Sequence, residues 1–351
     1  MGDSPRVLVV HTAFIGDIIL ALPLVQSLRQ QLPGAHVTFL AIPESASILK
    51  NHPAIDSIAV YDKKGSEKGV AGILQKARNL RSDEYDIALV PHRSLRSAMI
   101  AFLSAIPRRI GFSNSAGRLL FTDTVAYEKD WHEIDRNLKL LIPLNITPAQ
   151  HVLPVLYPGE EDVEIVDRAM ENHFGHSPSA PIAGIAPGSV WNTKRWPMER
   201  FAELCLRLMA LGFGIALIGG NADMELCKKI AQTLATKHLL NASGKLTLLQ
   251  SAELIRRCTV LVSNDSAPMH MAVAVGTPVV AIFGPTIPRF GFSPLGPHDK
   301  VIEIQGLPCR PCSSHGGDKC PIKTFVCMNQ IGVERLVSAV LQIAPKNETK
   351  V

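Results

Sequence analysis

Two apolar segments in the last third of the chain end in polar or glycine-rich residues, and this pattern constrains the fold most strongly. Thr259–Val262 leads into Ser-Asn-Asp-Ser at 263–266, after which a helix-like run begins. Pro278–Phe283 stops at a Gly-Pro-Thr sequence. Short continuous apolar runs are typical of parallel strands that are buried on both faces, and ligands bind beyond the carboxyl ends of such strands. The pattern therefore predicts a nucleotide site at the carboxyl edge of an α/β sheet.

Strands and helices alternate in two series. The candidate strands of the first series are Arg6–Thr12, His36–Ala41, Ser57–Tyr61, Tyr85–Pro91 and Arg108–Phe112. Those of the second series are Ile182–Ala186, Gly214–Gly220, Thr259–Val262 and Pro278–Phe283. Helical spacing of apolar residues occurs at 18–32, where Pro23 predicts a kink or a separate first turn, and at 198–211, 246–257 and 332–344. This alternation predicts an α/β fold of two doubly wound, Rossmann-like domains that face each other across a cleft.

The length of 351 residues fits two domains of roughly 150 residues each. We expect an amino-terminal domain over 1–155 and a linker, rich in proline and polar residues, over 156–180. A carboxyl-terminal domain over 181–330 would follow, then a final helix and tail over 331–351. In that last helix, Val333, Leu336, Val340 and Ile343 share one side.

Composition excludes several classes of function. The net charge of +5 suits an anionic substrate or membrane surface, but no nucleic-acid-binding motif is present and we expect no nucleic-acid partner. An aromatic content of 5% argues against a carbohydrate surface of stacked rings. No signal-peptide pattern and no apolar run near about 20 residues is found, which predicts a cytoplasmic protein with reduced or metal-bound cysteines.

The loops after the first and fourth strands carry charged residues. The first loop reads Phe-Ile-Gly-Asp at 14–17 and lacks the G-x-G-x-x-G pattern of a dehydrogenase. Asp17 could cap a helix or take a proton from an acceptor hydroxyl. Four arginines near strand ends form either an anion-binding wall or a solvated face: Arg93, Arg96, Arg108 and Arg109.

Three loops of the second series have the composition of a phosphate or nucleotide site. Residues 186–197 combine Gly188 with hydroxyl and basic side chains, which suits phosphate recognition; a solvated pair of basic residues is the alternative. The spacing does not match a Walker A loop. Residues 218–223 contain two glycines, which could contact a ribose or simply form a turn. In 263–270, backbone amides at 265–267 could bind a diphosphate, and His270 could donate to it or bind a backbone carbonyl.

Four cysteines lie within a short carboxyl-terminal stretch: Cys309, Cys312, Cys320 and Cys327. They could bind zinc tetrahedrally, although their spacing differs from that of a zinc ribbon. Thiols that order the loop by packing are an equal alternative.

Taken together, these motifs resemble the ADP-heptose:lipopolysaccharide heptosyltransferases of glycosyltransferase family 9, and most closely the heptosyltransferase II branch. The resemblance covers nearly the whole chain. It rests on five motifs in the family's order, at 14–17, 91–98, 106–112, 187–197 and 264–270. It implies the GT-B architecture, in which the final helix crosses back to the amino-terminal domain.

The resemblance implies transfer of L-glycero-D-manno-heptose from its ADP derivative to the lipopolysaccharide inner core, with inversion and without a required cofactor. Asp17 matches the family's general base, and Arg93, Arg96 and Arg109 would face the acceptor. The donor-binding residues would be Ser189, Thr193, Lys194, Asn221 (or Asp223 in another register), Leu246, Asp265, Ser266, Ala267 and His270. We also expect a monomer that contacts the cytoplasmic face of the inner membrane peripherally.

Other functions stay open at this point. Heptosyltransferase I, acting on Kdo2-lipid A, shares the donor motifs. A sugar-nucleotide epimerase of the same architecture would act on the donor alone. A nucleotide-sugar-binding or metal-binding protein would use the cysteine loop and catalyse no transfer.

Overall fold

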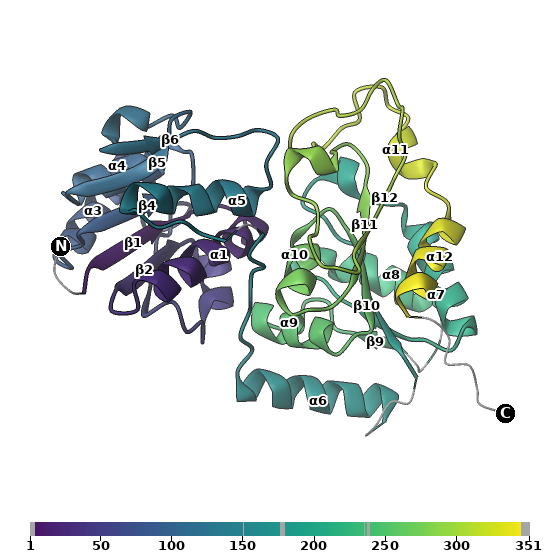
Figure 1. Ribbon diagram of the computed structural model, residues 1–351. Coiled ribbons are helices and arrows are strands. Elements are labelled where there is room, and N and C mark those ends of the chain that lie inside the picture. Colours follow the sequence, from purple (N-terminus) through teal and green to yellow (C-terminus); the bar gives the residue numbers. More distant parts are fainter. Residues whose placement is uncertain (1–3, 150, 176–179, 235, 237–238, 345–351) are drawn as a thin grey trace. The chain divides into compact units, whose positions relative to one another are not determined.

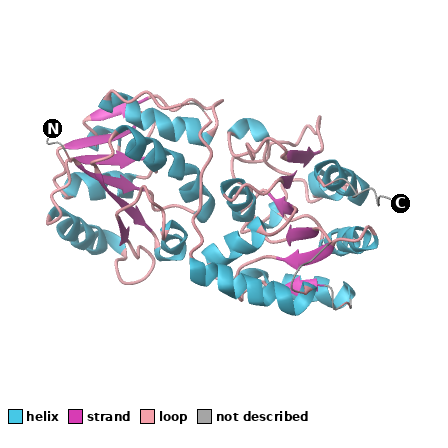
Figure 2. Ribbon diagram, turned by 60° about the horizontal axis from the view of Figure 1, so that its bottom comes forward, coloured by secondary structure: helices cyan, strands magenta, loops and turns pink. Residues whose placement is uncertain are grey.

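The computed structural model describes residues 4–149, 151–175, 180–234, 236 and 239–344. The chain divides into two compact units, Met1–Tyr157 and Pro158–Val351, each with its own six-stranded parallel sheet (Figure 1). Helices cover both faces of each sheet (Figure 2). Among the described residues, no helix is both long and apolar enough to span a bilayer.

Unit 1 has the strand order β3-β2-β1-β4-β5-β6. Its strands are β1 (Arg6–Val10), β2 (His36–Ala41), β3 (Ser57–Val60), β4 (Ile87–Val90), β5 (Arg108–Phe112) and β6 (Asp123–Val125). Its α-helices are α1 (Ile15–Gln31), α2 (Pro43–Ala46), α3 (Gly69–Arg81), α4 (Leu95–Leu103) and α5 (Glu133–Leu138). Short 3-10 turns are η1 (Ser47–Leu49), η2 (Arg118–Leu120) and η3 (Lys139–Leu144).

Unit 2 has the order β12-β11-β10-β7-β8-β9. Its strands are β7 (Ile182–Ala186), β8 (Gly214–Leu217), β9 (Leu239–Asn241), β10 (Val260–Asn264), β11 (Val279–Phe283) and β12 (Lys300–Glu303). Its α-helices are α6 (Glu160–Phe174), α7 (Met198–Ala210), α8 (Met224–Leu234), α9 (Leu248–Arg256), α10 (Ala267–Ala274), α11 (Val326–Asn329) and α12 (Val333–Ile343). Its 3-10 turns are η4 (Asn192–Lys194), η5 (Asn221–Asp223) and η6 (Pro288–Phe290).

The central strands are apolar along their whole length because both of their faces are buried. Every residue of β4, β10 and β11 is buried. All nine predicted strands are present, within a few residues of their expected ends. The predicted α/β fold with two doubly wound sheets is therefore confirmed.

Some sequence expectations need correction. Helix α1 runs unbroken through Pro23, so no separate first turn forms. The expected linker, 156–180, contains α6, which packs on α9. The final helix, expected to cross back to the amino-terminal domain, packs on α7 within unit 2 (Figure 1). Residues 345–351 of the expected tail lie outside the described residues.

Candidate functional site

Each sheet has one point at which the chain's winding direction reverses. It lies between β1 and β4 in unit 1, and between β10 and β7 in unit 2. Loops beyond the carboxyl ends of such strand pairs diverge and leave room for a ligand. Four of the predicted motifs follow these four strands directly, so they lie at the expected sheet edges.

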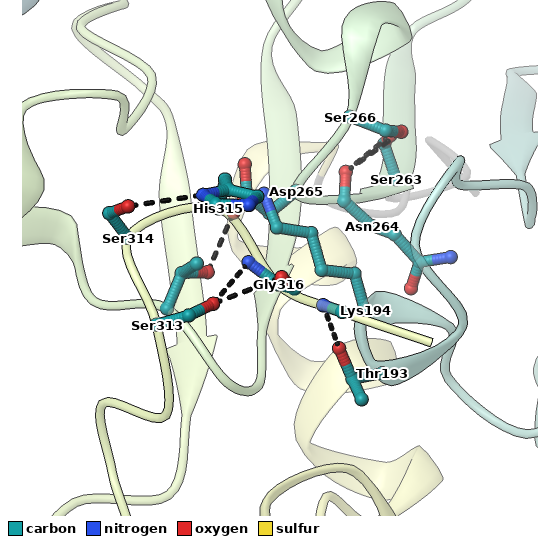
Figure 3. A network of polar contacts seen from close by, with 12 residues as sticks. Thr193, Lys194, Ser263, Asn264, Asp265, Ser266, Ser313, Ser314, His315 and Gly316 are labelled. Atoms are coloured by element: carbon teal, nitrogen blue, oxygen red, sulfur yellow. Dashed lines mark hydrogen bonds and ion pairs between the residues drawn. The ribbon is translucent and has the colours of Figure 1, made fainter. Parts of the chain in front are cut away.

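The centre of the unit 2 edge is a buried ion pair. The Lys194 Nζ lies 2.6 Å from Oδ2 of Asp265, and the side chains are only 12% and 7% exposed (Figure 3). Lys194 ends η4, and Asp265 follows β10. Lys194 is therefore not the solvated basic residue of the alternative interpretation. The neighbouring Arg195 is exposed, and its Nε donates to the Ser189 carbonyl at 2.8 Å.

Asn264 and Ser266 tie the end of β10 to the loop after β7. The Asn264 amide donates to the Pro187 carbonyl at 2.8 Å, and its Oδ1 accepts the Trp196 N–H at 3.1 Å. The Ser266 hydroxyl donates to the Gly188 carbonyl at 3.3 Å. These bonds satisfy buried polar groups and fix the loop that carries Ser189 and Lys194.

Thr193 holds a distant segment against η4. Its N–H donates to the Gly317 carbonyl at 3.0 Å, and its hydroxyl oxygen accepts the Gly317 N–H at 2.9 Å. Segment 313–316 consequently passes beside Lys194 (Figure 3). The contacts of Thr193 thus give it a part in building the site, whereas sequence reasoning assigned it to donor binding.

The amides of residues 265–267 are not equivalent. The Asp265 N–H donates to the Ile282 carbonyl at 3.1 Å and thus extends the sheet. Contrary to the sequence expectation, this amide is therefore not available to a ligand. Ser266 is the N-cap of α10, and Ala267 is its first residue. Amides in a first helical turn lack intrahelical partners and favour anions. His270 is buried in the same helix.

The other expected donor residues lie in the loops after β8 and β9. Asn221 is exposed at the start of η5, and Leu246 is partly buried in the turn before α9. The Asp223 carboxylate accepts the Gly220 N–H at 3.0 Å. It lies so close to Gly188 that an added Cβ there would stand 2.1 Å from its Oδ1. Of the two polar candidates, Asp223 is therefore the one against the Gly188 loop.

In unit 1, Asp17 lies in the first turn of α1 and is partly exposed. The N-cap position belongs to Phe14, so the interpretation of Asp17 as the N-cap residue is wrong. A carboxylate in a first turn, directly after β1, stands at the carboxyl edge of the sheet.

A histidine and hydroxyl network fills the β1/β4 edge. The His92 Nδ1 lies 2.9 Å from the Ser97 hydroxyl and 3.2 Å from that of Thr12. The His11 ring stacks on His92, with centroids 5.6 Å apart, and its buried Nδ1 has no hydrogen-bond partner among the described residues. Burial lowers the pKa of His92 to about 4, and the positive charges of Lys63, Arg93 and Arg96 add to this effect.

Sequence analysis missed Lys63, which lies in the loop after β3. Its ammonium donates to the Thr12 carbonyl at 2.5 Å. Burial, followed by the charges of Arg96 and Lys64, lowers the pKa of Lys63, while Glu44 opposes this shift. Within the described ranges, Lys63, Arg93 and Arg96 form no ion pair with a carboxylate. We call these three residues the basic cluster.

Arg109 does not join the basic cluster. It stands near the start of β5, in register with Ala88 of β4, and thus at the amino end of the sheet. Its guanidinium donates to the carbonyls of Leu120, Ile106 and Pro107. Arg108 instead pairs with Asp123 at 3.4 Å. The expectation that Arg109 faces the acceptor together with Arg93 and Arg96 is therefore wrong, because ligand loops lie at the opposite strand ends.

The four carboxyl-terminal cysteines belong to the segment that leads into α11. In the described part of the chain, no group of three or more His, Cys, Asp or Glu side chains is placed to hold a metal ion. Cys309, Cys312, Cys320 and Cys327 are all free thiols. The Cys312 N–H donates to the Pro285 carbonyl at 3.0 Å, so this loop packs beside the unit 2 edge.

Several known proteins resemble this chain along most of its length. Lipooligosaccharide heptosyltransferase 2 of Haemophilus influenzae is 29% identical over 309 residues, which covers 85% of this chain and 88% of that protein. Among solved structures, E. coli ADP-heptose lipopolysaccharide heptosyltransferase II has a TM-score of 0.78 at 25% identity, covering 96% of this chain and 98% of that one. The family 9 glycosyltransferase of Veillonella parvula reaches a TM-score of 0.83 at 26% identity, with 97% of both chains covered.

The profile of glycosyltransferase family 9 (heptosyltransferase) matches residues 73–321. This range includes three of the six strands of the unit 1 sheet, all six strands of the unit 2 sheet, and the unit 2 edge with segment 313–316. That match and the two similar structures lead to one assignment: the chain belongs to glycosyltransferase family 9 and is a glycosyltransferase of the two-domain GT-B fold.

Proposed function

We propose that this enzyme transfers L-glycero-D-manno-heptose from ADP-heptose to heptosyl-Kdo2-lipid A, as a heptosyltransferase II. The buried Lys194–Asp265 pair at the β10/β7 edge is the observation that carries the donor half of this proposal. Relatives named heptosyltransferase 2 support the choice of type. Those from Salmonella typhimurium and E. coli are each 28% identical over 307 residues, and a Pseudomonas aeruginosa heptosyltransferase 1 is 25% identical over 319 residues.

Unit 2 binds the donor. The Lys194 ammonium and the first-turn amides of α10 neutralise the diphosphate, and Ser189, Asp223 and Leu246 border it. Preorganised donors of this kind stabilise charge that develops on a leaving group, so no step needs a metal ion. His270 lies in the same helix and would donate a hydrogen bond or proton to the departing ADP.

Unit 1 binds the acceptor. The basic cluster holds a phosphate or carboxylate of the lipopolysaccharide core, and Lys63 takes the place of Arg109 in it. Asp17 takes the proton of the acceptor hydroxyl. The freed oxygen bonds to the anomeric carbon on the face opposite to ADP, and ADP leaves with the electron pair of the broken C–O bond.

The acceptor is anchored in a lipid bilayer, so we propose peripheral contact with the inner membrane through basic and apolar loops of unit 1. Among the described side chains of this unit, Leu119 and Phe14 are exposed large apolar groups. Anionic lipid should strengthen such contact, and salt should weaken it. Activity on vesicles that responds to neither would contradict an electrostatic contribution.

A transfer assay read by mass spectrometry tests the proposal. The purified enzyme and ADP-heptose are mixed separately with Kdo2-lipid A and with its mono-heptosylated form. We expect one heptose to be added to the mono-heptosylated acceptor alone. Addition to bare Kdo2-lipid A would identify heptosyltransferase I instead. Conversion of the sugar nucleotide without transfer would indicate an epimerase.

A further inference from the structure

The polar contacts behind Lys194 continue to a residue outside the predicted donor set. Thr286 follows β11, and its side chain is almost completely buried. The Thr286 hydroxyl lies 2.6 Å from Oδ2 of Asp265, the same oxygen that the Lys194 ammonium contacts. A hydroxyl donor and an ammonium on one oxygen restrict rotation of the carboxylate. They also make Asp265 a shared anchor between two loops.

Thr286 is itself held from the other side. The Arg310 guanidinium donates twice to the Thr286 carbonyl, from Nε at 3.1 Å and from Nη2 at 2.6 Å. Arg310 also donates to the Ile304 carbonyl at 2.8 Å and pairs with the Glu303 carboxylate. Its side chain is only 5% exposed. The cysteine-rich loop, whose sequence suggested a metal site, thus supplies the residue that supports Thr286.

The stem of Lys194 is also confined. Segment 313–316 passes beside it (Figure 3), and a Cβ added at Gly316 would meet the Lys194 Cγ at 3.1 Å. A lysine side chain loses much rotamer freedom on ordering, so an ammonium that is already ordered binds an anion at a lower entropic cost.

We propose that Thr286 is a positioning residue of the donor site. Through Asp265 it holds the Lys194 ammonium where the diphosphate of the nucleotide sugar binds, and Arg310 holds Thr286 in turn. This inference rests on the proposed function, because it requires that Lys194 contacts the donor diphosphate.

Thr277 is a matched control at the opposite end of β11. Like Thr286 it is buried, and its hydroxyl donates to a single acceptor, the Ile255 carbonyl, at 2.9 Å. Thr→Val removes the hydroxyl at either position and keeps the shape of the side chain. The two variants should therefore lose similar stability, whereas only Thr286→Val should alter the donor site.

The experiment measures the affinity of the full-length protein for ADP by calorimetry, with melting temperatures recorded in parallel. We expect Thr286→Val to weaken ADP binding about tenfold, the effect of about one lost hydrogen bond. Thr286→Ser keeps the hydroxyl and should stay within about twofold of the parent, as should Thr277→Val. In a Lys194→Ala background, Thr286→Val should weaken ADP binding no further, because Thr286 acts through Lys194.

Unchanged ADP affinity in Thr286→Val would overturn the inference. So would an equal loss in Thr277→Val, or additive losses in the double variant. Should Thr286→Val fail to fold, Arg310→Gln removes the support of the Thr286 carbonyl from outside the site and carries the same expectations, including dependence on Lys194. Unchanged affinity in Lys194→Ala alone would instead contradict the proposed donor site, so the two failures are distinguishable.

Discussion

At the residue scale, the role of Asp17 follows from its position in the first turn of α1 at the carboxyl edge of the unit 1 sheet. We predict that Asp17→Ala lowers turnover at least ~100-fold, because a positioned general base typically contributes 10²–10⁴-fold. Affinity for ADP should stay near that of the parent, since Asp17 belongs to unit 1 and the proposed donor residues belong to unit 2. Calorimetry with ADP and steady-state transfer rates measure the two effects. Near-normal turnover would remove Asp17 from the reaction.

Gly188 is a second residue whose surroundings predict the effect of a substitution on ADP binding. A Cβ there would stand 2.1 Å from the Asp223 Oδ1, whereas one at Gly220 would meet no atom of the described residues within 4 Å. We predict that Gly188→Ala displaces Asp223 or the 187–194 loop and weakens ADP binding about tenfold or more. The reason is that a methyl group added to a packed site forces its neighbours to move. Gly220→Ala is the matched control and should bind ADP normally. Equal affinities in the two variants would show that this close approach does not shape the donor site.

At the element scale, the strands that sequence reasoning missed share one physical property. The missed strands β6, β9 and β12 are all edge strands. They have only 3, 3 and 4 residues, and no residue of β6 or β12 is fully buried. An edge strand needs fewer apolar residues than a central one, so it leaves a weak signal. Helix α6 was missed for another reason: only Val166 and Met170 of its residues are buried, within a segment that proline and polar residues made look like a linker.

The amphipathic pattern of α12, in contrast, predicted its buried face correctly, although not the unit on which it packs. Val333, Leu336 and Val340 are buried against the unit 2 core, as their spacing indicated. We predict that Leu336→Ala lowers the free energy of unfolding by about 2–5 kcal/mol, because it leaves a cavity. Leu206→Ala in α7 is the control, since Leu206 is 47% exposed, and should cost about 0.5 kcal/mol or less. Urea denaturation measures both, and similar losses would contradict burial of the α12 face.

At the scale of the whole molecule, the sequence motifs identified the ligand-binding edge of each sheet, but they did not identify every residue that lies there. The loops after β1, β4, β7 and β10 carry contiguous polar motifs, so sequence reasoning found them. Lys63 comes from the loop after β3, where it is a single residue within an unremarkable sequence. Thr286 ends the Gly-Pro-Thr sequence after β11, which indicated a strand end but gave Thr286 no role of its own. Only the order of the strands reveals that these loops lie beside the motifs. The prediction for Arg109 failed for the opposite reason. Its motif is typical of an anion-binding site, but the residue lies at the amino end of β5.

Unit 1 also contains three histidines whose surroundings oppose protonation. Burial, together with His92 and Lys63, lowers the pKa of His11 well below 6.5. The pKa values of His52 and His92 are each lowered to about 4, mainly by burial. The His52 Nδ1 accepts the Ala54 N–H at 3.2 Å, and its ring packs edge-on against Tyr157. All three are neutral in the folded unit at pH 7.

Unit 1 should therefore lose stability on mild acidification. The unfolded chain protonates these rings near pH 6.5 while the folded unit does not, so stability is complete above pH 6.5 and falls progressively towards pH 4. A pKa lowered from 6.5 to about 4 corresponds to a loss of about 2 kcal/mol at pH 5 for His52 alone. Hydrogen exchange of β1 and β4 peptides in urea at pH 7.5 and pH 5 measures the effect. His52→Asn keeps an acceptor for the Ala54 N–H but cannot titrate, so its stability should depend less on pH than that of the parent. An identical pH dependence in both proteins would show that His52 is protonated in the folded state.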